Sequence, residues 1–481
     1  MGNYKREDLI FYATISAKDF VLENIFCRIY LPVRVADEIE IRFYPNKEHS
    51  EILQKRDNRL SIFTINGEIK NHLNEIQQSI YAERVISNGL STDSRGYNVS
   101  ETKLSGKALD LRITHHLNHS KVPQVFEGNF EISPNPLLQS SFIFNSSRLG
   151  EISFTHPHNF KFTINEKTEL VFEDVYKSCK NEHDDNVHFF ETIASFLIKG
   201  GTSESAKFDE IFEKLKIILL LASFAARQSC HCFGWSTYDT KSSITQYLRD
   251  KTKPSDSVLK RRNYDRDGVI DLADFNEFMT IAYDSFIKFP DTAILTRVIN
   301  FAIPNEEGTI ESEFVTLYAA LEMLVSHYRK SNNLEFIIKN NPFKKVRNGL
   351  KTIIEELEIE PFQKKMMQDK LSELNRVPFV TAFDEFCKNY SIEFQDLWSV
   401  TDNTDGITLA QVRNRLVHGE HFEAEDNFAL TYAKDHLQWL VERMILGILN
   451  FPTSKSLVCP ERLGIWYSYT KWSEYRQILT K

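Results

Sequence analysis

The chain has 481 residues, of which 42% are hydrophobic and 26% are charged. This length is more than one hydrophobic core serves, so two or three domains are expected, and the composition is that of a globular protein rather than a disordered one. The formal net charge of −9 argues against a uniformly basic surface for duplex DNA and limits nucleic-acid binding to local basic patches.

The six cysteines are scattered and match neither a disulfide framework nor a zinc-site spacing. We therefore expect a reduced, cytoplasmic protein with no cofactor and no metal. The start of the chain, MGNYKREDLI, does not have the pattern of a secretory signal. The most apolar stretch, residues 215–226, is too short to span a bilayer, so no membrane association is expected.

Residues 1–200 are predicted to form a β-rich domain. Short segments of alternating polarity, rich in Ile, Phe and Thr, are typical of strands, and Asn, Gly, Pro and Ser separate them. These segments are 20–33, 38–45, 59–69, 107–117, 128–134, 140–145 and 160–165. The pattern indicates a sandwich or a barrel, with one helix expected over residues 71–86.

The hydrophobic period becomes helical at residue 206 and is expected to stay so to about residue 450. We divide this half into a helical connecting region (201–300), a helical bundle (301–452) and an aromatic tail (453–481) that packs on the body. Within 309–330, one helix face carries Phe314, Leu317, Leu321, Leu324 and Val325. The predicted fold class is thus α+β and multidomain, with a β-rich N-terminal domain before an all-α bundle.

The strongest candidate site lies in the stretch QVRNRLVHGE at 411–420. Leu409, Val412 and Leu416 keep the apolar spacing of a helix. Gly419 stands where a left-handed residue commonly ends a helix. The stretch is therefore predicted to be the last part of a helix.

Three polar side chains occupy one edge of this helix end. Asn414 and His418 are four residues apart and share a face, with Arg413 beside them. An imidazole exchanges protons near neutral pH, and a guanidinium binds phosphate, so the set suits RNA cleavage without a metal. In the alternative interpretation Arg413 and His418 only cap the helix and pair with surface carboxylates. A looser arginine-to-histidine spacing also occurs at Arg112 and His119, where we expect a strand and a turn.

The helical half resembles the HEPN ribonuclease superfamily. The mark of that superfamily is an arginine, then Asn, Asp or His, three further residues and a histidine, which RNRLVH matches. The upstream segment FVTLYAALEMLVSHYRK is similar to the early helix of the ApeA-like branch, including its Leu-Glu pair. The order of a β-rich domain and then a helical domain is also similar to ApeA-like proteins. The motifs cover residues 300–450, whereas over 1–200 the resemblance rests on layout.

The resemblance implies a role for each motif residue. His418 would be the general acid or base, Arg413 would bind the scissile phosphate, and Asn414 would orient it. The 2′-hydroxyl of the RNA would attack and leave a 2′,3′-cyclic phosphate, with no metal. One such motif is half of an acid–base pair, which implies a homodimer formed through the helical domain.

The resemblance also implies a biological setting. The protein would be an endoribonuclease of bacterial antiphage defence by abortive infection, acting on tRNA or another structured RNA. Residues 1–200 would sense a phage-derived trigger or restrain the nuclease. One departure concerns HEPN toxins that a nucleotidyltransferase partner silences, which carry a tyrosine shortly after the motif histidine. His421 and Phe422 follow here instead, which favours a stand-alone effector.

Supporting residues are predicted on two other helices. Glu322 is a lone carboxylate in the apolar run LYAALEMLV, and Arg413 is a suitable partner that it would orient. The alternative is an ordinary exposed glutamate on a helix face. Basic residues offer the best local RNA-binding surface in this half, although a solvated helix face is the favoured explanation for them. These candidate RNA-binding residues are Lys344, Lys345, Arg347 and Arg415.

Two further clusters have structural explanations. Residues 263–274 imitate a calcium loop, but Asp274 replaces the usual final glutamate, so we predict a turn followed by a helix start rather than a calcium site. His115, His116 and His119 are expected at the end of a strand and in the following turn, with metal binding as the alternative. The rival to the nuclease as a whole is a non-catalytic HEPN-like module that binds a ligand or a protein.

Overall fold

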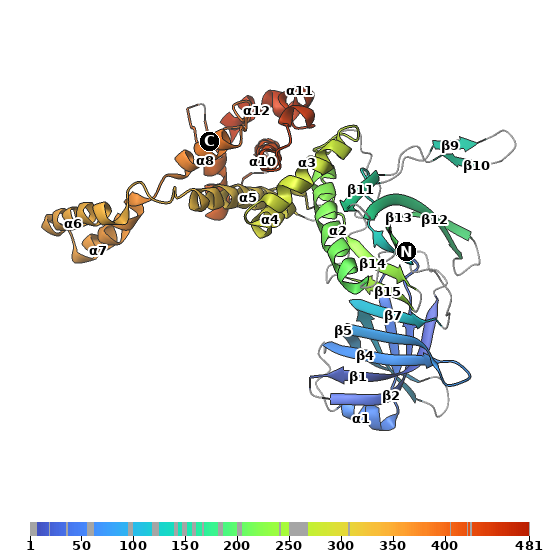
Figure 1. Cartoon of the computed structure of the whole chain (residues 1–481). Helices are drawn as coiled ribbons and strands as arrows, with labels where there is room; N and C mark the ends of the chain where they lie inside the picture. The colour runs from blue at the N-terminus through green and yellow to red at the C-terminus, as the bar shows by residue number, and fades with distance from the viewer. Residues whose placement is uncertain are drawn as a thin grey trace. The chain divides into compact units, whose positions relative to one another are not determined.

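The structure is a computed structural model of the whole chain (Figure 1). It describes residues 7–18, 20–34, 37–54, 62–94, 100–117, 125–138, 143–146, 152–155, 160–165, 168–180, 186–199, 204–239, 242–249, 268–305, 308–404, 406–420, 422–423 and 426–480. The chain divides into two compact units, residues 1–265 and residues 266–481. The order of a strand-rich region before a helical region confirms the predicted fold class.

The first unit consists mainly of antiparallel strands, together with α1 (Lys47–Gln54) and α2 (Glu204–Ala226). The strands are β1 (Asp8–Ala17), β2 (Phe20–Tyr30), β3 (Ile39–Tyr44), β4 (Ile62–Lys70), β5 (Ile76–Ser94), β6 (Ser100–Ala108), β7 (Asp110–His116), β8 (Val125–Ile132), β9 (Ile143–Ser146), β10 (Ile152–Thr155), β11 (Phe160–Asn165), β12 (Thr168–Lys180), β13 (Asn186–Lys199), β14 (Cys232–Tyr238) and β15 (Ser242–Leu248).

Part of this sheet closes into a barrel. Strand β5 pairs with both β4 and β6, and β1, β2 and β3 complete the circuit between them. Side chains on alternate positions point inward, as in β1, where Phe11, Ala13 and Ile15 are buried. Because the circuit of strands is closed, each of its strands has a neighbour on both sides, and the inward-pointing side chains form one continuous apolar interior.

The sheet extends beyond the barrel from β7 through β15, β14, β8, β13 and β12 to β11. Helix α2 packs against it through aromatic side chains. The Phe208 ring lies 4.4 Å from that of Trp235 in β14 and 5.6 Å from that of Phe130 in β8. The apolar run within α2 is therefore part of a protein core. Among the helices of the described residues, none is long and apolar enough to cross a membrane, and all six cysteines are free thiols.

Two sequence predictions for the first unit are wrong. The helix expected over residues 71–86 is largely the strand β5, in which Ile80 and Ala82 are buried and Tyr81 is exposed. Pairing with β4, β6 and β7 outweighs the helix-forming composition of this segment. The helical connecting region expected at 201–300 is interrupted by β14 and β15, which join the sheet, so the second unit begins at residue 266 rather than 301.

The second unit is helical. Its elements are α3 (Phe275–Lys288), α4 (Thr292–Ala302), α5 (Ile310–Ser331), α6 (Asn340–Glu356), α7 (Pro361–Lys370), the 3-10 turn η1 (Leu371–Asn375), α8 (Phe379–Asn389), α9 (Leu409–Val417), α10 (Asn427–Ile448), the 3-10 turn η3 (Thr453–Lys455), α11 (Pro460–Leu463) and α12 (Tyr467–Ile478). Helix α5 packs on α4, α8, α9 and α10, and α12 packs on α10. The five apolar residues predicted to share a face of α5 are all buried.

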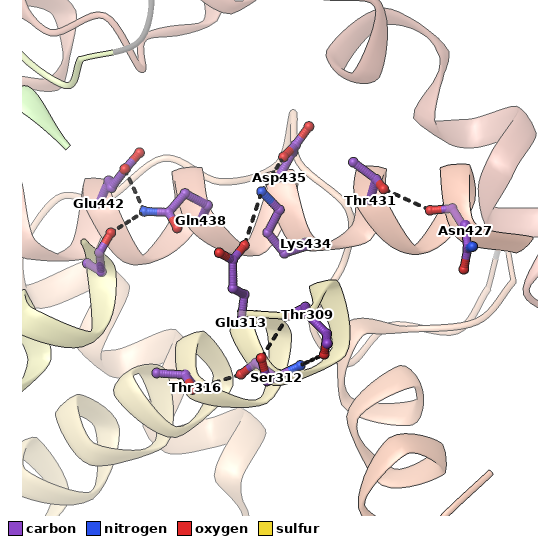
Figure 2. Close-up of polar contacts among 11 residues, drawn as sticks. Thr309, Ser312, Glu313, Thr316, Asn427, Thr431, Lys434, Asp435, Gln438 and Glu442 are labelled. Atoms are coloured by element: carbon purple, nitrogen blue, oxygen red, sulfur yellow. Dashed lines mark hydrogen bonds and ion pairs between the residues drawn. The ribbon is translucent and has the colours of Figure 1, made fainter. Parts of the chain in front are cut away.

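Polar side chains connect α5 and α4 to α10 along one face (Figure 2). The Lys434 ammonium of α10 lies 3.8 Å from Oε2 of Glu313 in α5. The Gln438 amide donates hydrogen bonds of 2.7 Å to the backbone carbonyl of Ala302 and to Oε1 of Glu442. The long central helix is thus joined to its neighbours by side-chain bonds as well as by apolar packing.

A buried ion pair joins α10 to the segment that precedes α9. Arg443 is fully buried and donates two hydrogen bonds to Asp396, of 2.7 and 2.8 Å. It also donates to the backbone carbonyls of Val458 and Glu393, at 2.9 Å each. Burial alone would raise the pKa of Asp396, but the hydrogen bonds from Arg443 and from the Tyr469 hydroxyl bring that pKa below its ordinary value. The charge of Arg443 is therefore balanced inside the core.

A buried histidine makes a second connection from α10. Nδ1 of His436 accepts a hydrogen bond of 3.0 Å from the backbone N–H of Trp398. Its Nε2 lies 3.1 Å from the Ser468 carbonyl, which only accepts, so Nε2 carries the proton and the ring is neutral. Burial lowers the pKa of His436 from 6.5 to about 4, and the Ser468 carbonyl offsets this only in part.

We expect the helical unit to lose stability as the pH falls from 6.5 to about 4. The unfolded histidine takes up a proton near pH 6.5, whereas folded His436 does so only near pH 4. Protonation therefore favours the unfolded chain across this window, and the contribution is complete above pH 6.5. The difference amounts to about 3 kcal/mol at the acid end.

Urea unfolding followed by tryptophan fluorescence measures this effect, because Trp398, Trp439, Trp466 and Trp472 lie in the helical unit. A His436→Asn variant keeps an acceptor for the Trp398 N–H and has no titrating ring. Its unfolding free energy should change less with pH than that of the unchanged protein. An equal pH dependence in both proteins would show that His436 is not the source.

Candidate functional site

The predicted motif lies on the short helix α9, whose beginning is fixed by a capping box. The Thr408 hydroxyl accepts a hydrogen bond of 3.1 Å from the Gln411 N–H, and the Gln411 side chain accepts one of 2.8 Å from the Thr408 N–H. Leu409 and Val412 are fully buried, and α9 packs on α5. The buried side of α9 therefore sets the direction in which the motif side chains project.

The end of α9 also matches its prediction. His418 is the C-cap residue, and Gly419 has a φ of +82°, in the left-handed region. The Glu420 N–H donates to the Arg415 carbonyl at 3.0 Å, and the Gly419 N–H donates to the Leu416 carbonyl at 3.2 Å. This is a Schellman motif, which satisfies the last carbonyls of a helix. His418 is therefore placed at a defined, exposed helix end.

Arg413 lies between residues from two helices. One guanidinium nitrogen, Nη2, is 3.5 Å from Oε2 of Glu322 on α5, and Nη1 donates to the Asn414 side-chain oxygen at 3.2 Å. The guanidinium carbon is 5.8 Å from the centre of the Tyr318 ring. These contacts orient the Arg413 side chain. It remains 31% exposed and is therefore still accessible to a phosphate group.

The pairing of Glu322 with Arg413 was predicted from the sequence and is confirmed. The Glu322 side chain is 44% exposed, so it also resembles the alternative of a glutamate on an open helix face. An ion pair this exposed and this long contributes little to folding. Its physical effect is on the orientation of Arg413, whose movement it limits without burying the charge.

Tyr318 is a site residue that the sequence reasoning missed. It is 4% exposed, and burial raises its pKa to about 12, with the Glu322 charge adding to this and Arg413 opposing it. The phenol is therefore neutral at physiological pH and presents an aromatic ring to the guanidinium. Its spacing of four residues before Glu322 places both on one face of α5, which is the signal that could have identified it.

Arg415 has a different environment from Arg413. Its Nε donates to Glu420 at 2.8 Å, its Nη1 donates to the Leu479 carbonyl at 2.7 Å, and its guanidinium lies 4.6 Å from the Phe422 ring centre. These contacts attach the end of α9 to the region of α12. The RNA-binding role of Arg415 stays a prediction, and the observed contacts give it an anchoring role.

The other basic candidates are on α6. Lys344 and Lys345 are exposed and Arg347 is partly buried. Helix α6 packs on α7 and η1, whereas α9 packs on α5. The structure therefore groups these three residues on a helix whose main packing partners differ from those of α9, the helix of Arg413.

The two remaining clusters are only partly described. In the calcium-like loop, residues 263–267 lie outside the described part of the chain. In the described part of the loop, Ile270 forms an isolated β-bridge with Ser456. The Asp271 side chain accepts a hydrogen bond of 3.1 Å from the Ala273 N–H in the turn that follows. His116 ends β7, with Nε2 2.9 Å from the Ser79 hydroxyl, and His119 lies outside the described residues. Over the described residues, no group of three or more His, Cys, Asp or Glu could hold a metal ion.

Gly419→Ala should loosen the end of α9. A Cβ at this position would meet no atom within 4 Å, so the cost is the left-handed backbone itself, about 1–2 kcal/mol. Amide hydrogen exchange of a peptide spanning residues 409–420, read by mass spectrometry, should become faster. Gly419→Asn is the matched variant, because asparagine tolerates this conformation, and it should exchange more slowly than Gly419→Ala. Equal exchange in all three proteins would contradict the capping account.

Comparison with models of protein families, with curated proteins and with solved structures finds no match to this chain. The chemistry of the site is therefore argued from its own residues. They place an oriented arginine, an exposed amide and an exposed imidazole at one helix end, which is a set suited to binding a phosphodiester and moving a proton beside it.

Proposed function

We propose that the chain is an RNA endonuclease of the HEPN type that needs no metal for the cleavage step. The observation that carries this proposal is the position of Arg413, held between Glu322 and Tyr318 while remaining partly exposed, beside Asn414 and one helical turn from His418. A helix end used only for capping has no need of a partner on another helix to orient its arginine. The Glu322 contact therefore favours a functional arginine over a purely structural one.

In the proposed reaction the nucleophile comes from the RNA. Its 2′-hydroxyl attacks the adjacent phosphorus, so that the O2′–P bond forms while the P–O5′ bond breaks. One imidazole accepts the proton of the 2′-hydroxyl, and a second proton donor protonates the departing 5′-oxygen. Arg413 stabilises the charge on the phosphorane, and Asn414 donates to a non-bridging oxygen. The products are a 2′,3′-cyclic phosphate and a 5′-hydroxyl.

This reaction needs an acid and a base, and each copy of the motif offers one imidazole, that of His418. A homodimer with two motifs across a two-fold axis supplies both. The end of α9 suits such a contact, because Asn414, Val417 and His418 are all exposed there. An exposed apolar side chain next to the motif, Val417, would be covered by a second copy.

The biological role proposed for this activity is antiphage defence by abortive infection, in the cytoplasm, with tRNA or another structured RNA as substrate. The first unit is assigned the sensing of a phage-derived trigger or the restraint of the nuclease. It is a separate compact unit with a closed barrel and its own apolar core, so a ligand can act on it without entering the motif.

Purified protein incubated with total bacterial RNA in the presence of EDTA should cut a subset of RNAs. His418→Ala should reduce the cleavage rate by at least about a hundredfold, because proton transfer is lost while the fold is retained. Circular dichroism checks that fold. Full activity in the His418→Ala protein would sink the proposal, and RNA that binds without being cut by the unchanged protein would favour the non-catalytic binding module.

Glu322→Gln should slow cleavage by about tenfold, because Arg413 would keep its charge and lose a fixed orientation. The loss of an exposed ion pair should change the unfolding free energy by less than about 1 kcal/mol. Glu313→Gln is the matched control, since Glu313 is on the same helix and pairs with Lys434 of α10 instead (Figure 2). Single-turnover rates for the three proteins are the measurement. Equal rates for Glu322→Gln and Glu313→Gln would remove the positioning role.

A further inference from the structure

Helix α6 carries an apolar stripe that the chain leaves largely uncovered. Phe343, Val346, Leu350, Ile353 and Leu357 follow one another at spacings of three and four residues, so they form one continuous line along the helix. Val346 is 50% exposed, Ile353 is 57% exposed and Leu357 is 38% exposed. Ile354 is the buried residue of α6, and it supplies the contact within the hairpin that α6 forms with α7 and η1.

The facing helix α7 has the same character. No residue of this fully described helix is buried, and Phe362, Met366 and Met367 are 70%, 54% and 44% exposed. Two neighbouring helices thus present apolar side chains to solvent together, rather than singly as is normal on a surface. A helix with a heptad-like apolar line is stabilised chiefly by packing that line against another helix. We call residues 339–375 the α6–α7 arm.

Charge on the arm is separated along α6. The first half of the helix is basic, with Lys344, Lys345 and Arg347, and Lys351 follows just past its midpoint. The turn between α6 and α7 is mainly acidic, with Glu355, Glu356, Glu358 and Glu360 around a shallow, open surface that Lys364 also lines. The carboxylates of the turn would repel an anionic membrane surface or the phosphates of an RNA backbone. A partner that presents an acidic group to the basic end and a basic group to the acidic turn matches both ends.

A second copy of the same arm meets these requirements. When two α6 helices lie antiparallel with Leu350 of each on a two-fold axis, Phe343 lies opposite the partner's Leu357, because both are seven residues from the axis. Lys344 then lies opposite the partner's Glu356. The apolar lines coincide and opposite charges flank them at both ends, as a self-complementary interface requires. Gly349, with no atom within 4 Å of where its Cβ would be, adds no bulk near the crossing point.

We infer that the α6–α7 arm is an association surface for a second copy of this chain, formed by antiparallel packing of the two arms. The inference goes beyond the proposed nuclease, because it uses no motif residue and does not depend on RNA cleavage. The proposed nuclease also needs a second copy, at the end of α9, so the role of the arm is read from the association of arm variants and the nuclease from the cleavage by His418→Ala.

Exchange of charge tests the pairing directly. One variant carries Lys344→Glu and Lys345→Glu, and a second carries Glu356→Lys and Glu355→Lys, the positions that lie opposite them. Each variant alone should associate more weakly, because like charges then face each other at both ends. An equimolar mixture of the two should associate as well as the unchanged protein, since each reversed end meets an opposite charge. Sedimentation velocity with one variant fluorescently labelled measures this, and no recovery in the mixture would overturn the antiparallel pairing.

Apolar substitutions test the stripe itself. Val346→Asp with Ile353→Asp should raise the dissociation constant by about tenfold or more, because two carboxylates would have to be buried on association. Ile287→Asp on α3 is the matched control, as Ile287 is also 50% exposed, and it should leave the dissociation constant unchanged. Circular dichroism confirms that each variant is folded.

Three results would overturn the inference. The unchanged protein could sediment as a monomer at tens of micromolar, which is well above the range of a specific interface. The Val346→Asp and Ile353→Asp protein could associate as tightly as the control. Phosphatidylglycerol vesicles or total RNA could bind the arm, with binding lost in the same double variant while self-association persists.

Discussion

The arrangement of the helical unit depends on the buried ion pair between Arg443 and Asp396. Loss of the partly exposed Asp396 would leave the buried charge of Arg443 without its partner, which typically costs about 3–5 kcal/mol. The pair fixes the segment that follows Asp396 against α10, and the bond from the Trp398 N–H to His436 fixes it two residues later. The Leu409 and Ala410 N–H groups then donate to carbonyls of this segment, at 3.0 and 3.1 Å. The start of α9, and with it the motif, is therefore positioned by the core of the unit.

The last helix completes this support. Arg476 donates to the Ile407 carbonyl at 2.9 Å, the Thr480 hydroxyl accepts from the Ile407 N–H at 3.1 Å, and Arg415 reaches the Leu479 carbonyl. Both ends of α9 are thus held by chain that follows it by more than sixty residues. In contrast, Glu322 and Tyr318 of α5 contact the Arg413 side chain; Tyr318 is also a buried residue of the core, whereas the exposed pair of Glu322 with Arg413 contributes little to the fold. The contacts that hold the two ends of α9 are therefore different from the contacts that orient Arg413.

Residue patterns predicted the local features better than the long-range ones. The apolar period of α5 and the left-handed Gly419 follow from spacing along single helices, which a sequence displays directly. The pairing of Glu322 with Arg413 joins two helices and was predicted from the need of a carboxylate in an apolar run for a partner. The segment of β5 has a helix-forming composition, and pairing with β4 and β6 overrides it. The strands β14 and β15 join the sheet through β8 and β7, which lie much earlier in the chain, so the local pattern did not reveal them. The contacts of Arg415 depend on tertiary packing that no periodicity encodes, whereas Tyr318 was missed although its spacing from Glu322 indicates a shared helix face.

The measurement that tests the central claim most directly is the chemistry of the RNA ends that the protein produces. Mass spectrometry of fragments formed in EDTA should find 2′,3′-cyclic phosphate on one side of each cut and 5′-hydroxyl on the other. A substrate with a single 2′-deoxy sugar at the cut should stay intact, because the attacking hydroxyl is missing. Fragments with 3′-hydroxyl and 5′-phosphate ends, or cleavage of the 2′-deoxy substrate at the same site, would contradict the account.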